Sequence, residues 1–586
     1  MCKIVICFVL FFSNALVAQT IPETRKIDWS IAGLTNYNEP SLFINMSTEG
    51  ADNTGLTAND ALLTTVLNSI PAAGAIIYFP NGEYLFNQRM VLKSNIVIRG
   101  ESADNTILKF NLGGINNCFH IEGAQTAFET QVANDLVKGQ SVFNVVDTGN
   151  FVIGGFAVLS EDDSDKVTSS WALRTSGQVV EIANIVGNQI TIKNPLRRNY
   201  LITAGPKLVR INPIKNIGIE NLTIHRLDAT TNQTSNITIN RGSNIKISCV
   251  KSFNSNFAHI AINKATNVVV EGSYFQDGFS YGNGGKAYGV VLQNTTGESL
   301  IYNNIFSHLR HSILLQSGSN GNVISYNFSR DPYWTDVALP ANSAGDIVLH
   351  GNYPYLNLFE GNIVQHIVID NSHGINGPHN TFHRNRAELY GIFMNSSPAS
   401  NNQNFSSNEI TNTGFLQGNY TLSGSGHYQY NNNKNGTILP SGTNLVTPYS
   451  YYRSSSLSFY VTNSSWPPIG NVANYNTFLN ESKIRYSNSQ LTRCSTNETL
   501  DVDDFNFTSK VLLYPNPAKD LLKIESLIGI SQVQILAMDG KLVLNKHFNL
   551  VNDFSIDVSY LPNDVYLVKL IFDDSNTVVK KLIKLN

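Results

Sequence analysis

The sequence predicts an all-β chain built around a parallel β-helix, a solenoid whose short strands stack coil upon coil. Three observations support this: a phrase anchored on asparagine recurs, the strands between the anchors alternate apolar and polar residues, and no amphipathic helix accompanies the repeat. The anchors are Asn221, Cys249, Gly272, Asn304, Asn327, Asn362, Asn385 and Asn408. Subtracting successive anchors gives 28, 23, 32, 23, 35, 23 and 23, so the base period is 23 residues.

A coil of this length has room for three short strands and three turns, because a strand advances about 3.3 Å per residue. The recurring asparagine fits a turn position, since Asn tolerates left-handed backbone and stacked amides can pair from coil to coil. Cys249 occupies an anchor and is predicted to pack in the core. An Asn-rich disordered tract is disfavoured, because apolar residues accompany every repeat.

Composition favours a carbohydrate partner. The 586 residues carry a formal net charge of -3 and only 14% charged residues, which gives no reason to expect a nucleic acid or an anionic membrane as partner. A monomer is expected. Once a signal peptide is removed, Cys118, Cys249 and Cys494 remain, an odd and sparse set that does not predict a disulfide framework.

Residues 1–18 are predicted to be a secretory signal peptide. They carry Lys3, an apolar run from Ile4 to Phe12, and small residues near Ala15 and Ala18. The run is too short to span a bilayer, and no other stretch reaches about eighteen apolar residues, so no transmembrane helix is expected.

The segment from about 40 to 110 contains GADNTG, YFPNGEYLF and LKSNIVIRGE, and a helix predicted from Ala58 to Ser69 would cap the open end of the solenoid. On these motifs the chain resembles the pectate lyase superfamily, a likeness that the coils extend to about residue 430. The resemblance implies a right-handed parallel β-helix over residues 40–505 and a carbohydrate substrate. It does not imply one reaction, since lyases, hydrolases, epimerases and phage tailspikes share the fold.

Gly-punctuated strands between about 125 and 205 interrupt the repeat and predict a small antiparallel β insert. Such an insert would form one wall of a substrate cleft or serve as a structural spacer.

The end of the chain changes character from Val511 onward. It contains Tyr514-Pro515-Asn516-Pro517, an Asp539-Gly540 turn and a basic close with Lys580, Lys581 and Lys584. On these marks residues 510–586 resemble the C-terminal sorting domain of the type IX secretion system, with Asp564 departing from the Gly that commonly precedes the Val-Tyr pair. The resemblance implies a β-sandwich, a partnership with the type IX machinery, and a secreted or cell-surface protein.

The apolar strands of the repeat align on their last residues. Because side chains alternate between faces, two columns are predicted to point outward. The first is Asn263, Gln293, Gln316, His350, Asp370 and Asn395, and the second is His259, Gly289, Ser312, Asp346, His366 and Gly391. Adjacent coils lie about 4.8 Å apart, so His350 can contact Asp370, and Asp346 can contact His366. A carboxylate beside an imidazole raises its basicity, as a general base requires, although structural ladders use the same pairing.

Two inserted loops leave the solenoid before the strands that end at Gln293 and His350, and such loops commonly form the binding face. The first carries Lys286, the second carries Arg330, Asp331, Tyr333, Trp334 and Asp336, and the coil between them carries Arg310 and His311. More than half of the 12 histidines lie between His308 and His383. No standard metal-ligand spacing accompanies them, so a zinc site is not predicted.

A face with bases and carboxylate clamps suits β-elimination on a uronate sugar, which needs a base near C5, a neutralised carboxylate and an acid for the leaving oxygen. We therefore predict a lyase or dehydratase acting on an anionic polysaccharide or oligosaccharide. The catalytic candidates are His350, Asp370, Arg310, His311, Lys286 and His373, and the substrate-binding candidates are Arg330, Tyr333, Trp334, Gln316, His366 and Arg384. His350 supported by Asp370 is the base, and Arg310 or Arg384 is the clamp. The resemblance implies a variant in which Lys286 or Arg310 is the base and calcium is the neutralising cofactor.

Two further hypotheses stay open. Hydrolysis requires two carboxyl groups about 5 to 9.5 Å apart. Asp346 and Asp370 are offset by roughly 14 Å along the strand, so Asp331 or Asp336 would have to swing in. A non-catalytic glycan-binding β-helix or adhesin is the third hypothesis, and it predicts His and Arg side chains dispersed around the coil.

Overall fold

The computed structural model describes residues 19–35, 37–335, 345–443, 447–453, 469–470, 476–494, 511–537, 541–572 and 577–585. The predicted signal peptide, Asp336 and the Asp539-Gly540 turn lie outside these residues. The chain divides into two compact units, Met1–Thr496 and Asn497–Asn586. Each unit is described by itself.

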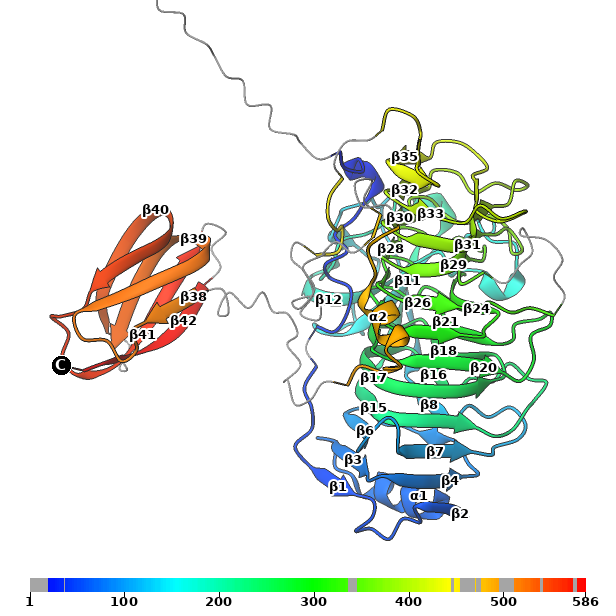
Figure 1. The fold of residues 1–586 in the computed structure, drawn as a ribbon, viewed down its shortest axis with the longest axis horizontal. Helices are drawn as coiled ribbons and strands as arrows, with labels where there is room; N and C mark the ends of the chain where they lie inside the picture. The colour runs from blue at the N-terminus through cyan, green and yellow to red at the C-terminus, as the bar shows by residue number, and fades with distance from the viewer. Residues whose placement is uncertain are drawn as a thin grey trace, which may run out of the picture. The chain divides into compact units, whose positions relative to one another are not determined.

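The first unit is a parallel β-helix, as the repeat predicts (Figure 1). Its coils contribute to three parallel sheets, which we call sheets 1, 2 and 3. Sheet 1 runs through β1 (Phe43–Asn45), β3 (Ala75–Phe79), β6 (Ile96–Gly100), the first part of β15 (Ile214–Arg226) and of β17 (Gly242–Ser255), β19 (Thr266–Glu271), β22 (Leu300–Tyr302), β25 (Val323–Ser325), β28 (Leu358–Glu360), β30 (Thr381–His383), β32 (Asn404–Ser406) and β35 (Tyr428–Tyr430).

Sheets 2 and 3 complete each coil. Sheet 2 runs through β2 (Thr54–Ala58), β4 (Gly82–Phe86), β7 (Thr106–Phe110), the second part of β15 and of β17, β20 (Tyr274–Gly278), β23 (Ile305–Ser307), β26 (Phe328–Arg330), the start of β29 (Ile363–Ile369) and of β31 (Arg386–Met394), β33 (Glu409–Ile410) and β36 (Asn432–Lys434), which also pairs antiparallel with β37 (Thr437–Leu439). Sheet 3 runs through β5 (Met90–Val91), β8 (Phe119–Glu122), β16 (Ile237–Asn240), β18 (Ala258–Asn263), β21 (Tyr288–Gln293), β24 (His311–Leu315), β27 (Ile347–Leu349), the ends of β29 and β31, and β34 (Asn419–Thr421).

The inward side chains of all three sheets form one continuous apolar cluster from Met46 to Ile410. At its N-terminal end the helix α1 (Asp60–Ser69) packs Leu63, Val66 and Leu67 onto this cluster (Figure 1). The helix predicted to cap the solenoid is therefore confirmed, and the end coil does not leave its core open to water.

The asparagine repeat resolves into two neighbouring columns instead of one. Asn221, Cys249 and Gly272 hold left-handed backbone, and in later coils that role passes to the residue before each Asn anchor: Asn303, Tyr326, Gly361, Arg384 and Ser407. The anchors from Asn304 onward occupy the next position, where their side chains are fully buried. The prediction that the Asn anchors themselves take the left-handed conformation is therefore wrong beyond Gly272.

The buried anchors form the predicted amide ladder. It runs through Asn304, Asn327, Asn362, Asn385, Asn408 and Asn432, with amide nitrogen to amide oxygen distances of 2.8–3.1 Å. Each Oδ1 also accepts a backbone N–H from the previous coil, and each amide nitrogen also donates to a main-chain carbonyl, as Asn362 does to Ile324. A second ladder joins Asn322, Asn357, Asn380 and Gln403. Neighbouring coils are thereby locked in register.

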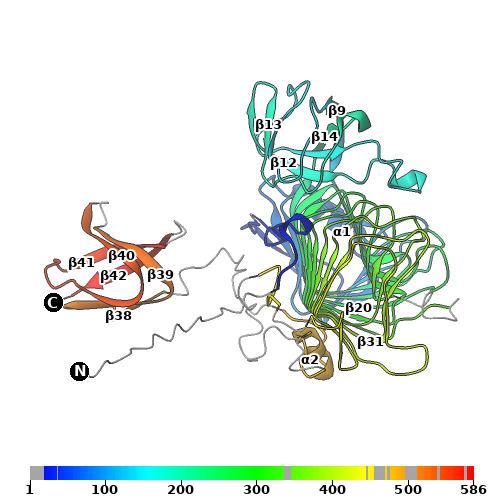
Figure 2. The ribbon, with the colours of Figure 1, turned by 90° about the horizontal axis from the view of Figure 1, so that it is seen from above.

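The predicted insert is a six-stranded antiparallel sheet beside the coils (Figure 2). Its order is β10 (Val142–Asn144), β13 (Gln189–Ile192), β12 (Gln178–Val186), β11 (Phe156–Ser160), β14 (Lys207–Asn212) and β9 (Ala124–Gln131), and it also carries the short 3-10 helices η2 (Ser170–Ala172) and η3 (Ile202–Ala204). A buried ion pair between Arg197 and Glu298 fixes the insert to the solenoid, and Arg197 also donates to Asn320 at 2.7 Å. The insert is therefore held on the turns that follow sheet 3.

A strap formed by residues 476–494 covers the corner between sheets 1 and 2. The helix α2 (Glu481–Ser487) and its flanks hydrogen-bond to carbonyls at that corner, through Asn480 to Asn327, Ser482 to Tyr326 and Arg485 to Asn303. Cys494 then forms a disulfide with Cys249, with their Cα atoms 4.9 Å apart. Cys249 is buried as predicted, and Cys118 stays free and buried. The cysteines form no framework, but the sequence did not predict the one pair that joins Cys249 to Cys494.

The described strands of the second unit form one antiparallel sheet around its own buried cluster. They are β38 (Val511–Tyr514), β39 (Leu521–Ala537), β40 (Leu542–Asp557), β41 (Asp564–Phe572) and β42 (Thr577–Lys584). Asp564, which stands where the sorting-domain family commonly has Gly, is the first residue of strand β41. No helix among the described residues of either unit has the length and apolar character needed to cross a bilayer.

We predict that Asn362→Ala lowers the free energy of unfolding of the β-helix by about 2–4 kcal/mol. The change removes the acceptor of two hydrogen bonds from Asn327 and leaves the Ile324 carbonyl without its donor, and each buried unsatisfied group costs about 1–3 kcal/mol. Urea unfolding followed by tryptophan fluorescence measures this, because the described residues Trp29, Trp171 and Trp334 lie in the first unit and the sequence of the second unit contains no tryptophan.

The matched control is Asn87→Ala, because Asn87 is exposed and its side chain makes no hydrogen bond among the described residues. This change is expected to stay within about 0.5 kcal/mol of the parent chain. Equal effects of the two substitutions would contradict the role given to the ladder.

Candidate functional site

A groove of about 950 Å³ lies over the outer face of sheet 3. Its floor comes from strands β8, β16, β18 and β21 and from the residues that end the later strands. The residues that line it are Asn117, Glu122, Trp171, Gln233, Ser235, Thr238, Asn240, Arg241, Phe257, Ala261, Asn263, Lys264, Asn283, Gly284, Gly285, Tyr288, Gln293, Asn294, Arg310, Gln316, Trp334, His350, Ser372 and His373. Its size is at the upper end of ordinary ligand sites, which measure about 300–1,000 Å³.

Four residues of the first predicted column line this groove, namely Asn263, Gln293, Gln316 and His350, whereas Asp370 and Asn395 do not. Strand pairing places Asn263 beside Gln293, and the pairs Leu315 with Leu349 and Leu349 with Ile369 bring the following residues Gln316, His350 and Asp370 into line. Gln316 donates to the Gln293 amide oxygen at 2.5 Å, whereas its own Oε1 is buried without a donor among the described residues. Gln316 is thus placed as a binding residue would be.

His350 and Asp370 form the predicted pair, with Nδ1 of the imidazole 2.5 Å from Oδ2 of the carboxylate. Burial would raise the pKa of Asp370, but the charge and the hydrogen bond of His350 outweigh it, and the pKa is lowered. An ionised Asp370 accepts from the Nδ1–H, so the lone pair of a neutral His350 resides on Nε2. No described residue hydrogen-bonds to that Nε2, which leaves it free to take a proton.

Arg310 reaches the same end of the groove from the turn before β24. Its Nη1 donates to the Gly282 carbonyl at 2.9 Å, and its guanidinium lies 4.5 Å from the centre of the Trp334 ring. The Nε of Arg310 and the Nε1 of Trp334 are buried and have no hydrogen-bond partner among the described residues. Unpaired buried donors cost about 1–3 kcal/mol each, so an anionic group in the groove would stabilise both.

Two more predicted histidines surround His350. His373 lines the groove, with its ring 4.9 Å from that of His350 and its Nδ1 3.1 Å from the Ser169 hydroxyl of the insert. His311 has its ring 6.0 Å from that of His350, but it is buried and donates from Nδ1 to the Gly345 carbonyl. Burial first, then Arg310 and His350, lowers the pKa of His311 to about 3. His311 therefore stays neutral and supports the site from behind.

The sequence prediction missed Tyr288 and Trp171. Tyr288 begins β21 and lines the groove near Arg310, whose guanidinium is 5.7 Å from its ring centre, and no described group hydrogen-bonds to its hydroxyl. Burial raises its pKa, more than the opposing effect of Arg310, so the hydroxyl keeps its proton. The sequence feature that could have identified Tyr288 is its position at the end of the first inserted loop. Trp171 comes from η2 and has its ring 5.5 Å from that of His373.

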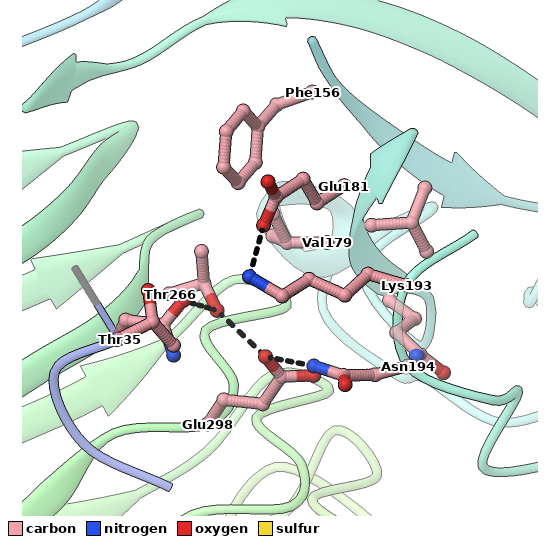
Figure 3. A pocket seen from close by; sticks show the side chains of 11 residues that line it. Thr35, Phe156, Val179, Glu181, Lys193, Asn194, Thr266 and Glu298 are labelled. Carbon is pink, nitrogen blue, oxygen red and sulfur yellow. Dashed lines mark hydrogen bonds and ion pairs between the residues drawn. The ribbon is translucent and has the colours of Figure 1, made fainter. Parts of the chain in front are cut away.

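The insert thus supplies one wall of the groove, the first of the two predicted alternatives. Backbone N–H groups of Thr168 and Ser169 donate to the Asn352 side chain, which anchors the segment that carries Trp171. A separate small pocket lies where the insert meets the coils: Glu298 accepts from Asn194 and Thr266, and Lys193 pairs with Glu181 (Figure 3). Its volume is about 10 Å³, no more than one water molecule needs, so this contact is structural.

The second predicted column does not face outward, and His366, a predicted binding residue, is buried and does not line the groove. His259, Ser312, Asp346 and His366 are buried, because sheet 3 begins at a tight corner that turns these side chains toward the neighbouring sheet. Asp346 contacts residue 366 as predicted, but it accepts from the backbone N–H of His366 at 3.0 Å and from the hydroxyl of Ser329 at 2.5 Å. Burial raises the pKa of Asp346 to about 6.

Several other predicted residues lie away from the groove. Arg384 occupies a left-handed corner position, is buried, and donates to carbonyls of Pro448, Ile469 and Gly470, which makes it structural. Arg330 is exposed and contacts Tyr486 of α2. Arg384 lies at the corner between sheets 1 and 2, and Arg330 ends β26 of sheet 2, so neither is placed to clamp a ligand beside His350.

Only some of the predicted residues in the two inserted loops line the groove. Lys286 does not line the groove, although its neighbours Asn283, Gly284 and Gly285 do. Tyr333 stacks on His308 with ring centres 4.7 Å apart and pins the loop down, while Trp334 lines the groove. Asp331 accepts from His308 at 2.7 Å.

No group of three or more His, Cys, Asp or Glu side chains gathers as a metal site among the described residues. Asp370 is engaged by His350. The structure thus offers no ready calcium ligand set in its described part, and the role of calcium stays a prediction.

Comparison with known proteins identifies both parts of the chain. Residues 43–331 match the family model described as rhamnogalacturonase A/epimerase, pectate lyase-like, and residues 512–585 match the secretion system C-terminal sorting domain. Both predicted resemblances are confirmed. The first model carries the names of carbohydrate-active proteins in its description, and the sorting domain indicates secretion or attachment at the cell surface. No curated protein shows a significant match to the chain.

Solved structures resemble the chain in fold alone. The tailspike protein gp49 from Pseudomonas phage LKA1 is 16% identical with a TM-score of 0.43, and the match covers 65% of this chain and 62% of the tailspike, less than two thirds of its length. An exopolygalacturonase from Thermotoga maritima is 12% identical with a TM-score of 0.37, covering 70% of this chain and 95% of that one. The Streptococcus pneumoniae adhesin PfbA is 13% identical with a TM-score of 0.33, covering 67% and 97%.

We predict that buried His259 makes the β-helix less stable in acid. Its Nδ1 accepts from the Ser252 hydroxyl and its Nε2–H donates to the Asp277 carbonyl, while burial lowers its pKa to about 3. The folded pKa is below the unfolded value of about 6.5, so the stability it contributes is full above pH 6.5 and is lost as the pH falls toward 3. Relative to His259→Gln, the parent chain should lose on the order of 2 kcal/mol more between pH 7 and pH 4.5.

Urea midpoints at the two pH values measure this difference. His547→Gln is the control, because His547 is exposed and lies in the second unit. The prediction fails if His259→Gln and the parent chain show the same pH dependence.

Proposed function

We propose, on the premise that residues 43–331 belong to the rhamnogalacturonase A/epimerase, pectate lyase-like family and residues 512–585 to a secretion sorting family, that this chain is an exported enzyme acting by β-elimination. Its substrate is an anionic, uronate-containing polysaccharide or oligosaccharide. Cleavage of a glycosidic bond and loss of water from a terminal residue are both eliminations that the same groups can carry out.

One observation supports elimination over hydrolysis: among the residues that the structure describes, the groove pairs an imidazole with a guanidinium, and no second carboxylate lines it near His350. Glu122 is the only acidic residue among the described residues that line it. Strand pairing places Glu122 beside Asn240, Asn240 beside Asn263 and Asn263 beside Gln293, and three further steps lead to Asp370. Six coil spacings of about 4.8 Å put the two carboxylates roughly 29 Å apart, far beyond the 5 to 9.5 Å that hydrolysis requires.

In the proposed reaction His350 removes the proton from C5 of the uronate. Its Nε2 is the base, and ionised Asp370 holds the Nδ1–H and stabilises the imidazolium as it forms. Arg310 donates its unpaired Nε–H to the carboxylate of the same sugar, and this charge-assisted hydrogen bond stabilises the negative charge that spreads onto the carboxylate.

Tyr288 is the proposed acid. As the bond from C4 to its oxygen breaks, the electron pair of the C5–H bond becomes the C4–C5 double bond and the leaving oxygen takes the phenolic proton. The Tyr288 hydroxyl is free among the described residues and its pKa is raised by burial, so it holds a proton to give. Trp334 and Trp171 provide ring faces against which the sugar can stack.

We predict that His350→Ala abolishes the rise in ultraviolet absorbance of the unsaturated uronate product, with a loss of at least about a hundredfold in rate.

Asp370→Asn should retain more activity than His350→Ala, because the imidazole stays in place without the charge that stabilises its protonated form. Tyr288→Phe should lower the rate with little effect on KM. The substrates are a panel of uronate-containing polysaccharides and their oligosaccharides.

His225→Gln is the matched control, since His225 is partly buried and lies outside the groove. Thermal melting of each variant checks that it is folded. New reducing ends without the absorbance change would identify hydrolysis, and neither signal across the panel would leave glycan binding as the function.

A further inference from the structure

We propose that Lys264 and Arg241 form a second carboxylate-binding subsite in the groove, three to four coils from His350, and that the substrate therefore carries uronate groups on more than one sugar. This inference rests on the proposed function and names its substrate class as a chain of acidic sugars bound along the solenoid axis. The scissile end lies at His350, and the rest of the chain extends toward the N-terminal coils.

Lys264 has no counter-charge among the described residues. It follows the last residue of β18 and lines the groove. Its backbone N–H donates to the Asn294 carbonyl at 3.0 Å, but its ammonium makes no hydrogen bond or ion pair with a described residue. Its side chain is half-buried, and burial together with the positive charge of Arg241 lowers its pKa. An ammonium that is partly desolvated beside a second cation is stabilised by any anion that binds there.

Arg241 lies one coil before Lys264 in the same column. Its Nη1 donates to the Glu122 carboxylate at 3.3 Å and to the Gly123 carbonyl at 3.2 Å, while its Nε is buried without a partner among the described residues. Glu122 also contacts His120 at 2.8 Å. Glu122 therefore balances Arg241, and Lys264 remains as net positive charge next to an unpaired guanidinium N–H. An ammonium and a guanidinium N–H side by side are donors that together can bind one carboxylate.

Both cations occupy backbone positions that do not favour them. Arg241 and Lys264 have φ of 51° and 47°, whereas the equivalent corner of the next coil is Asn294. Left-handed backbone is more costly for long side chains than for Asn or Gly. The chain thus places two cations at a corner where a smaller residue would be more stable, and both point into the groove lining.

The spacing fixes the size of the ligand. Strands β18, β21, β24 and β27 are successive neighbours in sheet 3, so Lys264 and His350 are three coil spacings apart, about 14 Å. One sugar ring is too short to reach both ends. Between them the groove presents the amides of Asn263, Gln293 and Gln316, which can hydrogen-bond to sugar hydroxyls and carry no charge.

The test measures binding separately from turnover. In a His350→Ala background, calorimetry gives the Kd of hexasaccharides and disaccharides of galacturonate, of mannuronate and of a glucuronate-containing glycosaminoglycan. For a hexasaccharide that binds, Lys264→Met should weaken binding about tenfold, the loss of one charge-assisted hydrogen bond, and leave disaccharide binding unchanged. Lys264→Arg should restore most of the affinity because it keeps the charge.

Lys215→Met is the control for net charge, since Lys215 packs over the Phe156 ring outside the groove. The inference is overturned if Lys264→Met and Lys215→Met have equal effects, if hexasaccharides bind no tighter than disaccharides, or if no acidic oligosaccharide binds. Lys264-dependent binding in a chain whose His350 form shows no elimination would support the subsite and reject the proposed reaction. If the chain carries out elimination but Lys264→Met has no effect on it or on binding, the proposed reaction is supported and the subsite is rejected.

Discussion

The structure depends on the stacking of coils in one fixed register, which the buried amide ladders enforce. Each ladder Asn accepts a backbone N–H and an amide N–H from the coil before it and donates to the coil after it and to a main-chain carbonyl. A shift of one residue would leave several of these groups unsatisfied in an apolar core, at about 1–3 kcal/mol each. The ladders therefore hold each coil in one alignment with its neighbours, so that side chains at equivalent positions of successive coils form a column.

That constraint explains where the groove can form. The core cannot absorb extra residues, so additional chain must leave at the turns, and the three largest departures surround the outer face of sheet 3. The insert is bound to the turns after that sheet through Arg197 and Glu298, and the two loops that carry Gly285 and Trp334 leave just before it. The groove is the space between these additions, over strands whose outward side chains are free to be polar.

The solenoid, the cap, the insert and the first column could be predicted from the sequence, because each follows from the repeat period or from the alternation of apolar and polar residues. The sequence placed His350 beside Asp370 because both end strands of the same sheet in adjacent coils. It failed for His366, because the corner where sheet 3 begins turns side chains inward and alternation holds only within a strand. It failed for Arg384 because the segment near Pro448 and Ile469 covers the corner after β30 and buries that side chain. The Cys249–Cys494 disulfide could not be predicted either, because the strap that brings Cys494 to the coils has no repeat of its own.

The two halves of the proposed catalytic group differ in how they are held. His350 and Asp370 stand on strand ends of adjacent coils, so the spacing that the ladders impose also sets the imidazole at hydrogen-bond distance from the carboxylate. Arg310 and Trp334 instead meet through a loop. The guanidinium lies over the indole ring, and each group keeps a buried donor without a partner among the described residues. A base needs a fixed orientation before the reaction, whereas a clamp gains its full strength only when a carboxylate arrives. The rigid solenoid thus supplies the group that must be preorganised, and the loop supplies the group whose hydrogen bonds are completed by the substrate.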